Sequence, residues 1–559
     1  MQLVAYGAQD VYLTGNPQIT FWKVTYRRHT NFSLESIEQT FNGQADFGRR
    51  VTCTISRNGD LAYRTYLQVT LPEINQQMTH SGTGTETHGV FARWLDCPGE
   101  QLISQVEVEI GGQRIDRQYG DWMHIWNQLT LSAEQEVGYN KMIGNTTQLT
   151  YITDPSFSPV DGPCDADGPR QVCAPRNALP ETTLYVPLQF WYCRNPGLAL
   201  PLIALQYHEV KINLDLRPID ECLWAVNNLS CMQGTAASAT SVKVTTAYNQ
   251  SLVAASLYVD YVFLDTDERR RMAQNPHEYL IEQLQFTGDE SVGSSSNKIK
   301  LNFNHPCKEL IWVVQPDENV DYCSSLECGT HLYTLLGAQP FNYTDAVDVL
   351  PNAIHAYGGP ESIAGPGDTE GFVTRYGAFS EPGAEDVASG DAWPYKSAGG
   401  GAKNTGDEYW NGDATAGGGF GNGGGETSTV SDAGTFVLSE CALMKHCWGE
   451  NPVVTAKLQL NGQDRFSERE GTYFDLVQPF QHHTRSPDTG VNVYSFALRP
   501  EEHQPSGTCN FSRIDSATLQ LVLSNATVEG TKTAKVRVYA TNYNVLRVMS
   551  GMGGLAYSN

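Results

Sequence analysis

The sequence predicts an all-β protein built from two related β-sandwiches, and three observations lead to this expectation. Short stretches of alternating apolar and polar residues recur along the chain, as at 106–110, 457–460 and 518–521. Because successive side chains of a strand point to opposite faces, this alternation indicates half-buried antiparallel strands. Turn sequences such as Asn58-Gly59 separate many of these stretches. The third observation is a phrase of sequence that occurs twice.

The repeated phrase reads VEVEIGGQRIDRQYGDWMHIW at 106–126 and KLQLNGQDRFSEREGTYFDLV at 457–477. In both, an alternating strand enters a glycine turn, a polar stretch follows, and a second glycine precedes an aromatic and apolar segment. With one inserted residue, the matched pairs are Gly112 and Gly462, Gln113 and Gln463, Arg114 and Arg465, Ile115 and Phe466, Gly120 and Gly471, Trp122 and Tyr473, Met123 and Phe474, and Ile125 and Leu476. We therefore interpret the chain as two copies of one sandwich fold.

Length and composition agree with two folded domains. The 559 residues exceed the roughly 250–300 that one hydrophobic core usually supports. Apolar residues make up 40% and aromatic residues 10% of the chain, which is enough to build cores. The start of the sequence lacks the pattern of a secretion signal, and no apolar stretch is long enough to span a bilayer. We expect a soluble protein that is not exported by the usual route.

Two short helices are predicted. Ser132 and the glutamine three residues later suggest a capping box that opens a helix towards Met142. A second helix is expected after Asn275, with Pro276 at its first position and Glu278 answering the cap. This second helix lies at the midpoint of the chain.

Two other segments have unusual composition. The stretch 358–431 holds about twenty of the 52 glycines and has little periodicity, so we expect a long surface loop. The basic run Arg269–Arg271 follows three acidic residues, and we expect it to pair locally at a helix start, with contact to an acidic partner as the alternative.

The sequence offers no convincing chemistry, so we expect no catalytic, cofactor-binding or metal-binding residues and no enzyme. The thirteen cysteines lack paired CxxC spacing, and the closest pairs are Cys164 and Cys173, Cys323 and Cys328, and Cys441 and Cys447. The GxGxxG match at 419–424 has no strand before it or helix after it. His482 and His483 are adjacent, so on a strand only one could face an interior metal. Seven N-x-[ST] patterns, at Asn31, Asn145, Asn228, Asn249, Asn342, Asn510 and Asn525, are interpreted as chance.

Four stretches resemble the major capsid proteins of large double-stranded DNA viruses of eukaryotes, the group that includes iridoviruses, phycodnaviruses and marseilleviruses. They read FLDTDERRRMAQNPHEYLIEQLQF, HPCKELIWVVQP, ALPLIALQYHEVKI and NVYSFALRPEEHQPSGTCNFSRIDSATLQL. The resemblance extends from about Gly7 to the C-terminus, apart from the glycine-rich segment and the loop 155–175.

The resemblance implies two tandem eight-stranded jelly rolls, a double jelly roll, with a few short helices and long surface loops. The expected regions are an N-terminal extension on the inner face at 1–29, jelly roll 1 at 30–264, an inter-domain connector at 265–285, jelly roll 2 at 286–545 with an outer glycine-rich loop at 358–431, and a C-terminal tail at 546–559.

The resemblance also implies the function of a major capsid protein, whose pseudo-hexameric homotrimers tile the icosahedral shell of a large DNA virus. Its expected partners are other copies of itself in the trimer and in neighbouring capsomers, minor capsid and penton proteins, and an inner membrane near the N-terminus. The expected location is the outer shell of the virion, assembled in the host cytoplasm. Direct nucleic-acid binding is not expected, because a net charge of −25 repels phosphates.

Two other functions suit a duplicated sandwich. A lectin-like module would bind glycans through its loops, either alone or as an attachment role on a capsid surface. A metal enzyme of the cupin type would need histidines that converge on one interior face, and the sequence supplies only the pair His482 and His483.

Overall fold

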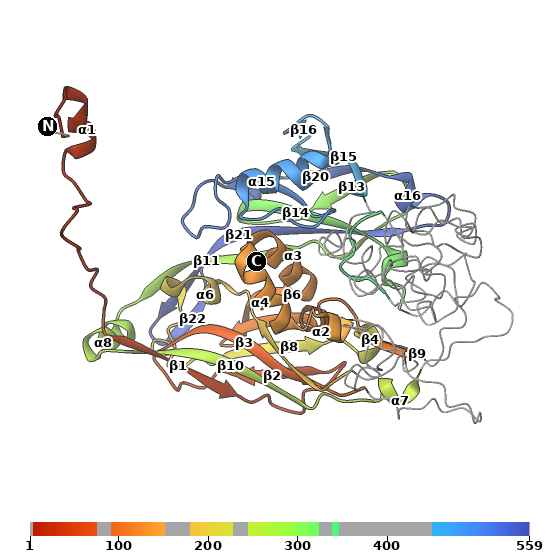
Figure 1. Cartoon of the computed structure of the whole chain (residues 1–559), viewed down its shortest axis with the longest axis horizontal. Coiled ribbons are helices and arrows are strands. Elements are labelled where there is room, and N and C mark those ends of the chain that lie inside the picture. The colour runs from red at the N-terminus through yellow and green to blue at the C-terminus, as the bar shows by residue number, and fades with distance from the viewer. Residues whose placement is uncertain are drawn as a thin grey trace, which may run out of the picture.

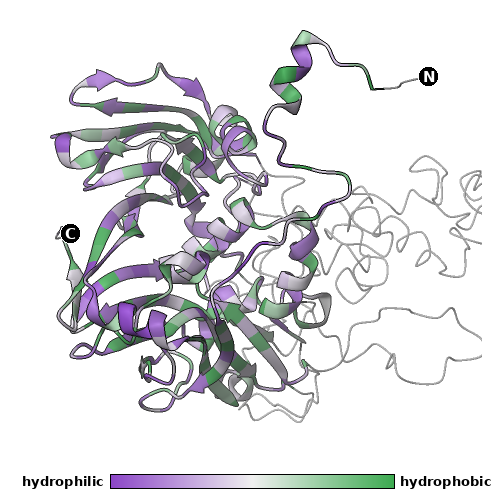
Figure 2. Ribbon diagram, turned by 90° about the vertical axis from the view of Figure 1, so that its left-hand side faces the viewer, coloured by the Kyte–Doolittle hydropathy of each residue, from purple (hydrophilic) through white to green (hydrophobic). Residues whose placement is uncertain are grey.

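The computed structural model describes residues 4–74, 91–150, 179–226, 244–322, 338–345 and 450–557. The predicted glycine-rich loop, the GxGxxG match and the three cysteine pairs lie outside these residues. Antiparallel strands dominate the described chain, and hydrophobic and hydrophilic residues alternate along many of them (Figure 2). No helix in the described ranges is long and apolar enough to cross a membrane.

The first half of the chain forms two four-stranded antiparallel sheets that enclose one hydrophobic core. The first sheet has the order β1 (Phe32–Gln39), β10 (Ala254–Leu264), β3 (Leu61–Leu71) and β7 (Thr182–Pro187). The second has the order β2 (Arg50–Thr54), β8 (Val210–Leu216), β5 (Ile103–Ile110) and β6 (Gln113–Tyr119). A separate pair is formed by β4 (Phe91–Trp94) and β9 (Leu223–Val226).

The second half repeats this arrangement around a second core. Its first sheet has the order β11 (His277–Phe286), β21 (Ala534–Met549), β14 (Pro306–Pro316) and β18 (Asn492–Ser495), extended by β12 (Glu290–Val292), β19 (Cys509–Asn510) and β22 (Met552–Leu555). Its second sheet has the order β13 (Ser296–Leu301), β20 (Ala517–Leu523), β15 (Val453–Leu460) and β16 (Gln463–Asp464), with β17 (Arg469–Glu470) also on β15.

The two halves share one topology. When the eight principal strands of each half are numbered in chain order, both halves read 1-8-3-6 in one sheet and 2-7-4-5 in the other. This pairing of first with last strand is that of the jelly roll. The predicted double jelly roll is therefore confirmed, and the duplicated phrase falls on the same elements in both copies, β5 with β6 and β15 with β16.

Helices are short and lie mostly in the connections. Those of the first half are η1 (Ala8–Asp10), α1 (Val11–Thr14), α2 (Pro98–Leu102), α3 (Gly120–Thr130), α4 (Ala133–Ile143), α5 (Thr147–Thr150), α6 (Trp191–Arg194), η2 (Pro196–Leu198), η3 (Ile219–Glu221) and α7 (Thr245–Tyr248). Those of the second half are α8 (Thr266–Gln274), η5 (Asp317–Val320), the π-helix η9 (Tyr473–Val477), α15 (Gln478–His482), η10 (Phe511–Arg513) and α16 (Asn525–Val528). The helix predicted after Ser132 is confirmed as α4, with Ser132 at its N-cap, but the predicted capping box is wrong because the Ser132 side chain makes no capping hydrogen bond.

The predicted helix after Asn275 is wrong. Helix α8 ends at Gln274, Asn275 is its C-cap, and the residues after Pro276 form strand β11. The local cap pattern is overridden because β11 pairs with β21 along its whole length, from His277 to Phe286. The expected local pairing of the basic run is also wrong for Arg269, whose guanidinium bonds Asp60 at 3.0 Å.

The two termini behave differently. Residues 4–30 run away from the body of the molecule (Figure 1). The C-terminal residues instead form the end of β21 and the hairpin strand β22. Leu546 and Val548 pack in the core cluster of the first jelly roll, so the end of the chain ties the two halves together.

Candidate functional site

The two histidines considered for an interior metal point to different partners. His483 is buried between the carboxylates of Glu309 and Glu501, with both nitrogen–oxygen distances 2.9 Å. Burial lowers the pKa of His483, but the two carboxylates outweigh it and raise the pKa to about 9. His482 bonds the backbone oxygen of Leu498 at 3.1 Å. His483 therefore belongs to an ion-pair cluster, and the two histidines do not share one metal-binding face.

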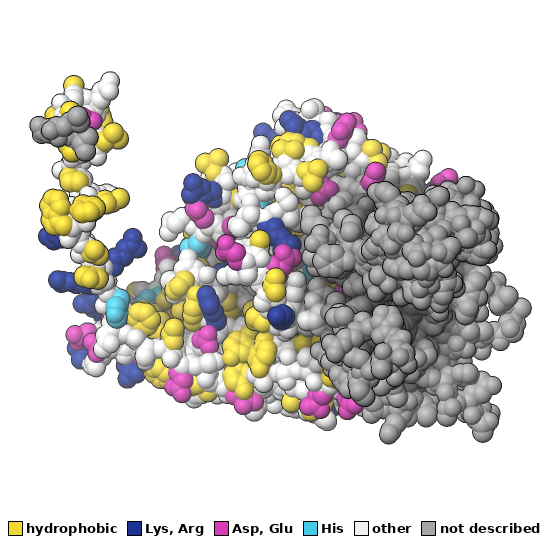
Figure 3. Space-filling model, in the orientation of Figure 1, with side chains coloured by type: hydrophobic (Ala, Val, Ile, Leu, Met, Phe, Trp, Pro, Cys, Tyr) yellow, Lys and Arg dark blue, Asp and Glu magenta, His cyan; other side chains and the backbone are white. Residues whose placement is uncertain are grey.

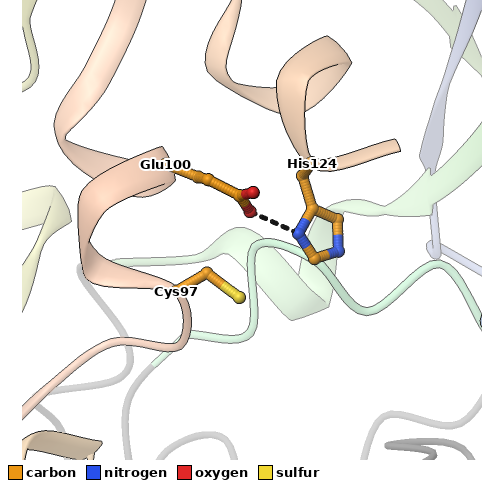
Figure 4. Close-up of side chains that lie close together, drawn as sticks. All are labelled: Cys97, Glu100 and His124. Atoms are coloured by element: carbon orange, nitrogen blue, oxygen red, sulfur yellow. Dashed lines mark hydrogen bonds and ion pairs between the residues drawn. The ribbon is translucent and has the colours of Figure 1, made fainter. Parts of the chain in front are cut away.

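Cys97, Glu100 and His124 are a potential metal-binding group among the described residues (Figure 4). All three are buried, and their candidate ligand atoms lie within 4.8 Å of one another. Glu100 comes from α2, Cys97 is the N-cap of that helix, and His124 lies on α3. The Nδ1 atom of His124 is 2.6 Å from Oε2 of Glu100.

The surroundings of His124 favour a hydrogen-bond chain over a metal ion. Asp488 fixes the amide of Gln128, because its backbone N–H donates to Oε1 and its carboxylate accepts from Nε2. The Nε2 amide group of Gln128 therefore faces Nε2 of His124 at 3.0 Å and donates to it. Nδ1–H of His124 then donates a hydrogen bond to Glu100. Burial lowers the pKa of His124, but the Glu100 carboxylate outweighs it and raises the pKa, so the imidazole holds this proton firmly. If a metal ion bound Nδ1, the proton of the imidazole would lie on Nε2. That N–H group would then face the N–H group of Gln128, and two donors cannot form a hydrogen bond with each other.

This chain of hydrogen bonds crosses between the jelly rolls. Glu100, His124 and Gln128 belong to the first half, whereas Asp488 belongs to the second. We call the contact region between the two jelly rolls the seam.

A second polar chain crosses the seam through Asp121 on α3. Its Oδ2 accepts from Nη1 of Arg537 on β21 at 2.9 Å. Its Oδ1 accepts from Nη2 of Arg217, in the first half, at 3.4 Å. Arg537 also donates to Asp289 and Gln315, so its guanidinium is bonded on both edges. Pairing of this kind is needed wherever charge is buried.

Glu282 on β11 is the centre of a third cluster. Its carboxylate lies 2.8 Å from Nζ of Lys308 and 3.1 Å from Nη1 of Arg194, which is on α6 of the first half. Nδ1 of His503 lies 3.5 Å away. Burial raises the pKa of Glu282, but these cationic and donor groups overcome it and lower the pKa to about 2.

Asp116 on β6 bonds the backbone of the second half directly. Its carboxylate accepts from the backbone N–H of Leu284 at 3.1 Å and from that of Arg117 at 2.9 Å. The side chain of Gln283 also donates to the backbone oxygen of Ile115. Burial dominates here and raises the pKa of Asp116 to about 7.

Apolar side chains fill the rest of the seam. Helix α3 lies between the two halves (Figure 1). The ring of Trp122 on α3 lies 5.4 Å from that of Tyr539, and the ring of Tyr119 lies 5.0 Å from that of Phe286. The buried seam cluster comprises Cys97, Trp122, Ile125, Trp126, Leu129, Tyr139 and Ile143 from the first half and Ile311, Val313, Phe341, Tyr343, Val491, Val493 and Tyr539 from the second.

These seam residues could not be predicted from the sequence. Asp116 and Leu284 are 168 positions apart, and neither belongs to a recognisable motif. The expectation of no catalytic, cofactor or metal site stays a prediction. Among the glycosylation patterns, Asn342 is 5% exposed and bonds Gln339, so it is closed to modification in the folded chain.

Two family models match the chain. The model described as major capsid protein N-terminus matches residues 20–265, and the model described as large eukaryotic DNA virus major capsid protein matches residues 268–554. Their boundary falls at helix α8, between the two jelly rolls.

Individual relatives agree with the family models. The chain is 74% identical over 601 residues to the major capsid protein of Chrysochromulina ericina virus, covering 100% of this chain and 99% of the relative. It is 37% identical over 581 residues to that of Paramecium bursaria Chlorella virus 1, with the same coverage. A chain of the quasi-atomic model of the PBCV-1 virus capsid matches with a TM-score of 0.55 and 32% identity, covering 97% of this chain and 100% of that one.

The duplicated jelly rolls, the family models and the full-length relatives agree, and the chain belongs to the major capsid protein family of large eukaryotic DNA viruses.

Proposed function

We propose that this major capsid protein assembles as a homotrimer with a pseudo-hexameric outline, and that these trimers tile the icosahedral shell. The observation that carries the proposal is the shared strand order of its two jelly rolls. Three chains with two similar units each supply six similar wedges. A ring of such wedges has nearly sixfold edges and can pack against six neighbours.

Rigid joining of the two units supports this geometry. A pseudo-hexagon keeps its outline only if the angle between the two wedges of a chain is fixed. The seam combines a buried aromatic and aliphatic cluster with three polar chains. Such a contact opposes the hinge motion that a polar linker would allow.

We propose that the shell also contains minor capsid and penton proteins, and that the N-terminal arm contacts them or an inner membrane. The arm comprises residues 4–30, and its large hydrophobic side chains are exposed. They are Val4, Tyr6, Val11, Tyr12, Leu13, Ile19, Phe21, Trp22, Val24 and Tyr26. Exposed apolar residues in this number indicate an interaction segment. Assembly in the host cytoplasm and the absence of direct genome binding belong to the same proposal, the latter because of the net charge of −25.

Light scattering coupled to size-exclusion chromatography tests the central claim. The purified chain should elute with the mass of three copies, and negative-stain images should show hexagonal outlines. A monomer or dimer at the concentrations reached in an infected cell would overturn the proposal. A glycan-binding measurement on the same sample separates this function from that of a lectin-like module, because a capsid protein should form homotrimers without needing any affinity for glycans.

A further inference from the structure

Helix α3 of the first jelly roll packs on the outer face of a sheet of the second. The apolar residues Ile125, Trp126 and Leu129 of this helix are 0%, 4% and 0% exposed, and they belong to the seam cluster. The sheet they meet is β11-β21-β14-β18. Its inner face supports the core of the second jelly roll, so this sheet is buried on both faces.

The second jelly roll has a matching helical segment whose apolar residues are exposed. The second glycine of the repeated phrase, Gly120 or Gly471, starts both segments, and the same spacing from that glycine gives the equivalent positions. These are Ile125 with Leu476, Trp126 with Val477, and Leu129 with Phe480. The second members are 55%, 38% and 81% exposed. We call Leu476, Val477 and Phe480 the helical patch; it includes residues of η9 and α15, near the top of Figure 1.

The first jelly roll has a matching sheet face that is also uncovered. Its sheet β1-β10-β3-β7 occupies the place of the buried sheet in the second half. Three tyrosines lie on the outer face of this sheet: the ring of Tyr66 stacks on that of Tyr258 with centroids 5.4 Å apart, and it meets the ring of Tyr185 at a tilt with centroids 6.3 Å apart. Tyr185 is 39% exposed, and the other two are partly exposed. We call these residues the tyrosine face; hydrophobic side chains gather over β1, β3 and β10 in Figure 3.

We propose that the helical patch of one copy packs on the tyrosine face of a second copy. The occupant follows from the chain itself, because the seam already joins the equivalent helix to the equivalent sheet. Within one chain only one such contact can form. The helical patch of the second jelly roll and the tyrosine face of the first are therefore left without a partner from the same chain. Tyrosines are enriched at protein interfaces, since the ring buries area while the hydroxyl tolerates water.

The contact joins two different surfaces, so it is head-to-tail and repeats from copy to copy. It closes into a ring when the rotation per copy divides a full turn. This inference rests on the proposed trimer and adds to it the two surfaces that meet.

Two variants test the surfaces separately. In the first, Phe480→Glu places a charge on the helical patch. In the second, Tyr66→Glu and Tyr258→Glu do so on the tyrosine face. The altered side chains are exposed or partly exposed, so both variants should fold and give the far-ultraviolet circular dichroism of the parent. The mass by light scattering should fall from three copies to one in each. Met552→Glu, an exposed apolar position on β22, is the matched control and should stay trimeric.

Mixing the two variants provides the deciding measurement. Each keeps the surface that the other lacks, so the mixture should form a one-to-one heterodimer and stop there. Variants that had failed to fold would not pair. Trimeric single variants, or monomeric ones that do not pair on mixing, would overturn the inference. If the unaltered chain is trimeric in the same measurement, the proposed function survives that result; if it is monomeric, the proposed function itself fails.

Discussion

Gly120 and Gly471 occupy the same place in the two jelly rolls. A Cβ atom at Gly120 would lie 2.2 Å from the carbonyl oxygen of Ile103, and one at Gly471 would lie 1.8 Å from that of Val453. Ile103 and Val453 are each the first residue of the strand that enters the repeated turn. In both halves, then, the chain returns past the start of its own strand so closely that only glycine fits.

This relationship predicts that alanine is not tolerated at either glycine. Gly471→Ala and Gly120→Ala should each lower the free energy of unfolding by about 3 kcal/mol or more, because the contact is with backbone that cannot rotate away. Gly138→Ala is the control, since nothing lies within 4 Å of a Cβ there and the site is on an exposed part of α4. Alanine should stabilise that helix by up to about 1 kcal/mol. Urea denaturation of the three variants measures the difference.

Features of the fold that depend on neighbouring residues could be predicted from the sequence. Strand alternation, the glycine turns and the repeated phrase depend on neighbouring residues, so they revealed the duplicated sandwich. The helix predicted after Asn275 failed because a distant strand, β21, pairs with residues from His277 onward. Seam groups such as Asp116 were invisible for the same reason, since their environment is made by residues far away in the chain.

The cluster around Glu282 should make the protein sensitive to acid. The pKa of Glu282 is about 2 in the folded chain, against 4.5 for the free side chain. Stability from this group is therefore complete above about pH 5 and is lost as the pH falls towards 2. The contribution at neutral pH is about 3 kcal/mol.

Glu282→Gln tests this contribution. At pH 7 the variant should lose about 3 kcal/mol of unfolding free energy, because Lys308 would stay buried without its carboxylate. The difference from the parent should shrink towards pH 3. Glu278→Gln, on the same strand but exposed and paired with Arg547, is the control and should change stability little. If Glu282→Gln lost the same unfolding free energy at pH 7 and at pH 3, Glu282 would not carry the negative charge assigned to it in the folded chain.

Asp116 should give the opposite dependence of stability on pH. Its folded pKa is raised by burial to about 7, from 3.8, so the folded chain holds a proton that the unfolded chain releases. That stability is present at low pH and is lost as the pH rises through 7. Between pH 6 and pH 8 the unfolding free energy should fall by about 1 kcal/mol from this group. Asp116→Asn should remove this slope, whereas the exposed Asp515→Asn should retain it.

The cluster of Cys97, Glu100 and His124 should behave as a hydrogen-bonded support without metal. Added zinc should not raise the melting temperature, and a chelator should not lower it. Gln128→Leu should cost about 1–3 kcal/mol, because Asp488 and Nε2 of His124 would lose their shared partner. A melting temperature that rises with zinc concentration would contradict this, because it would show that Nδ1 of His124 can lose its proton and bind a metal.

Removal of residues 1–25 should separate folding from shell assembly. None of η1 and α1 is buried, and the large apolar side chains of the arm point into solvent, so the jelly rolls lose no core contact when the arm is deleted. The shortened chain should melt like the parent and form the same trimer. Its ability to build shells with other virion components should fall, because the deleted residues offer exposed apolar surface together with the cationic side chain of Lys23. A second variant that keeps the arm but replaces Phe21 and Trp22 by serine distinguishes apolar contact from length. Normal shells from both variants, counted by electron microscopy, would show that the arm has no part in assembly.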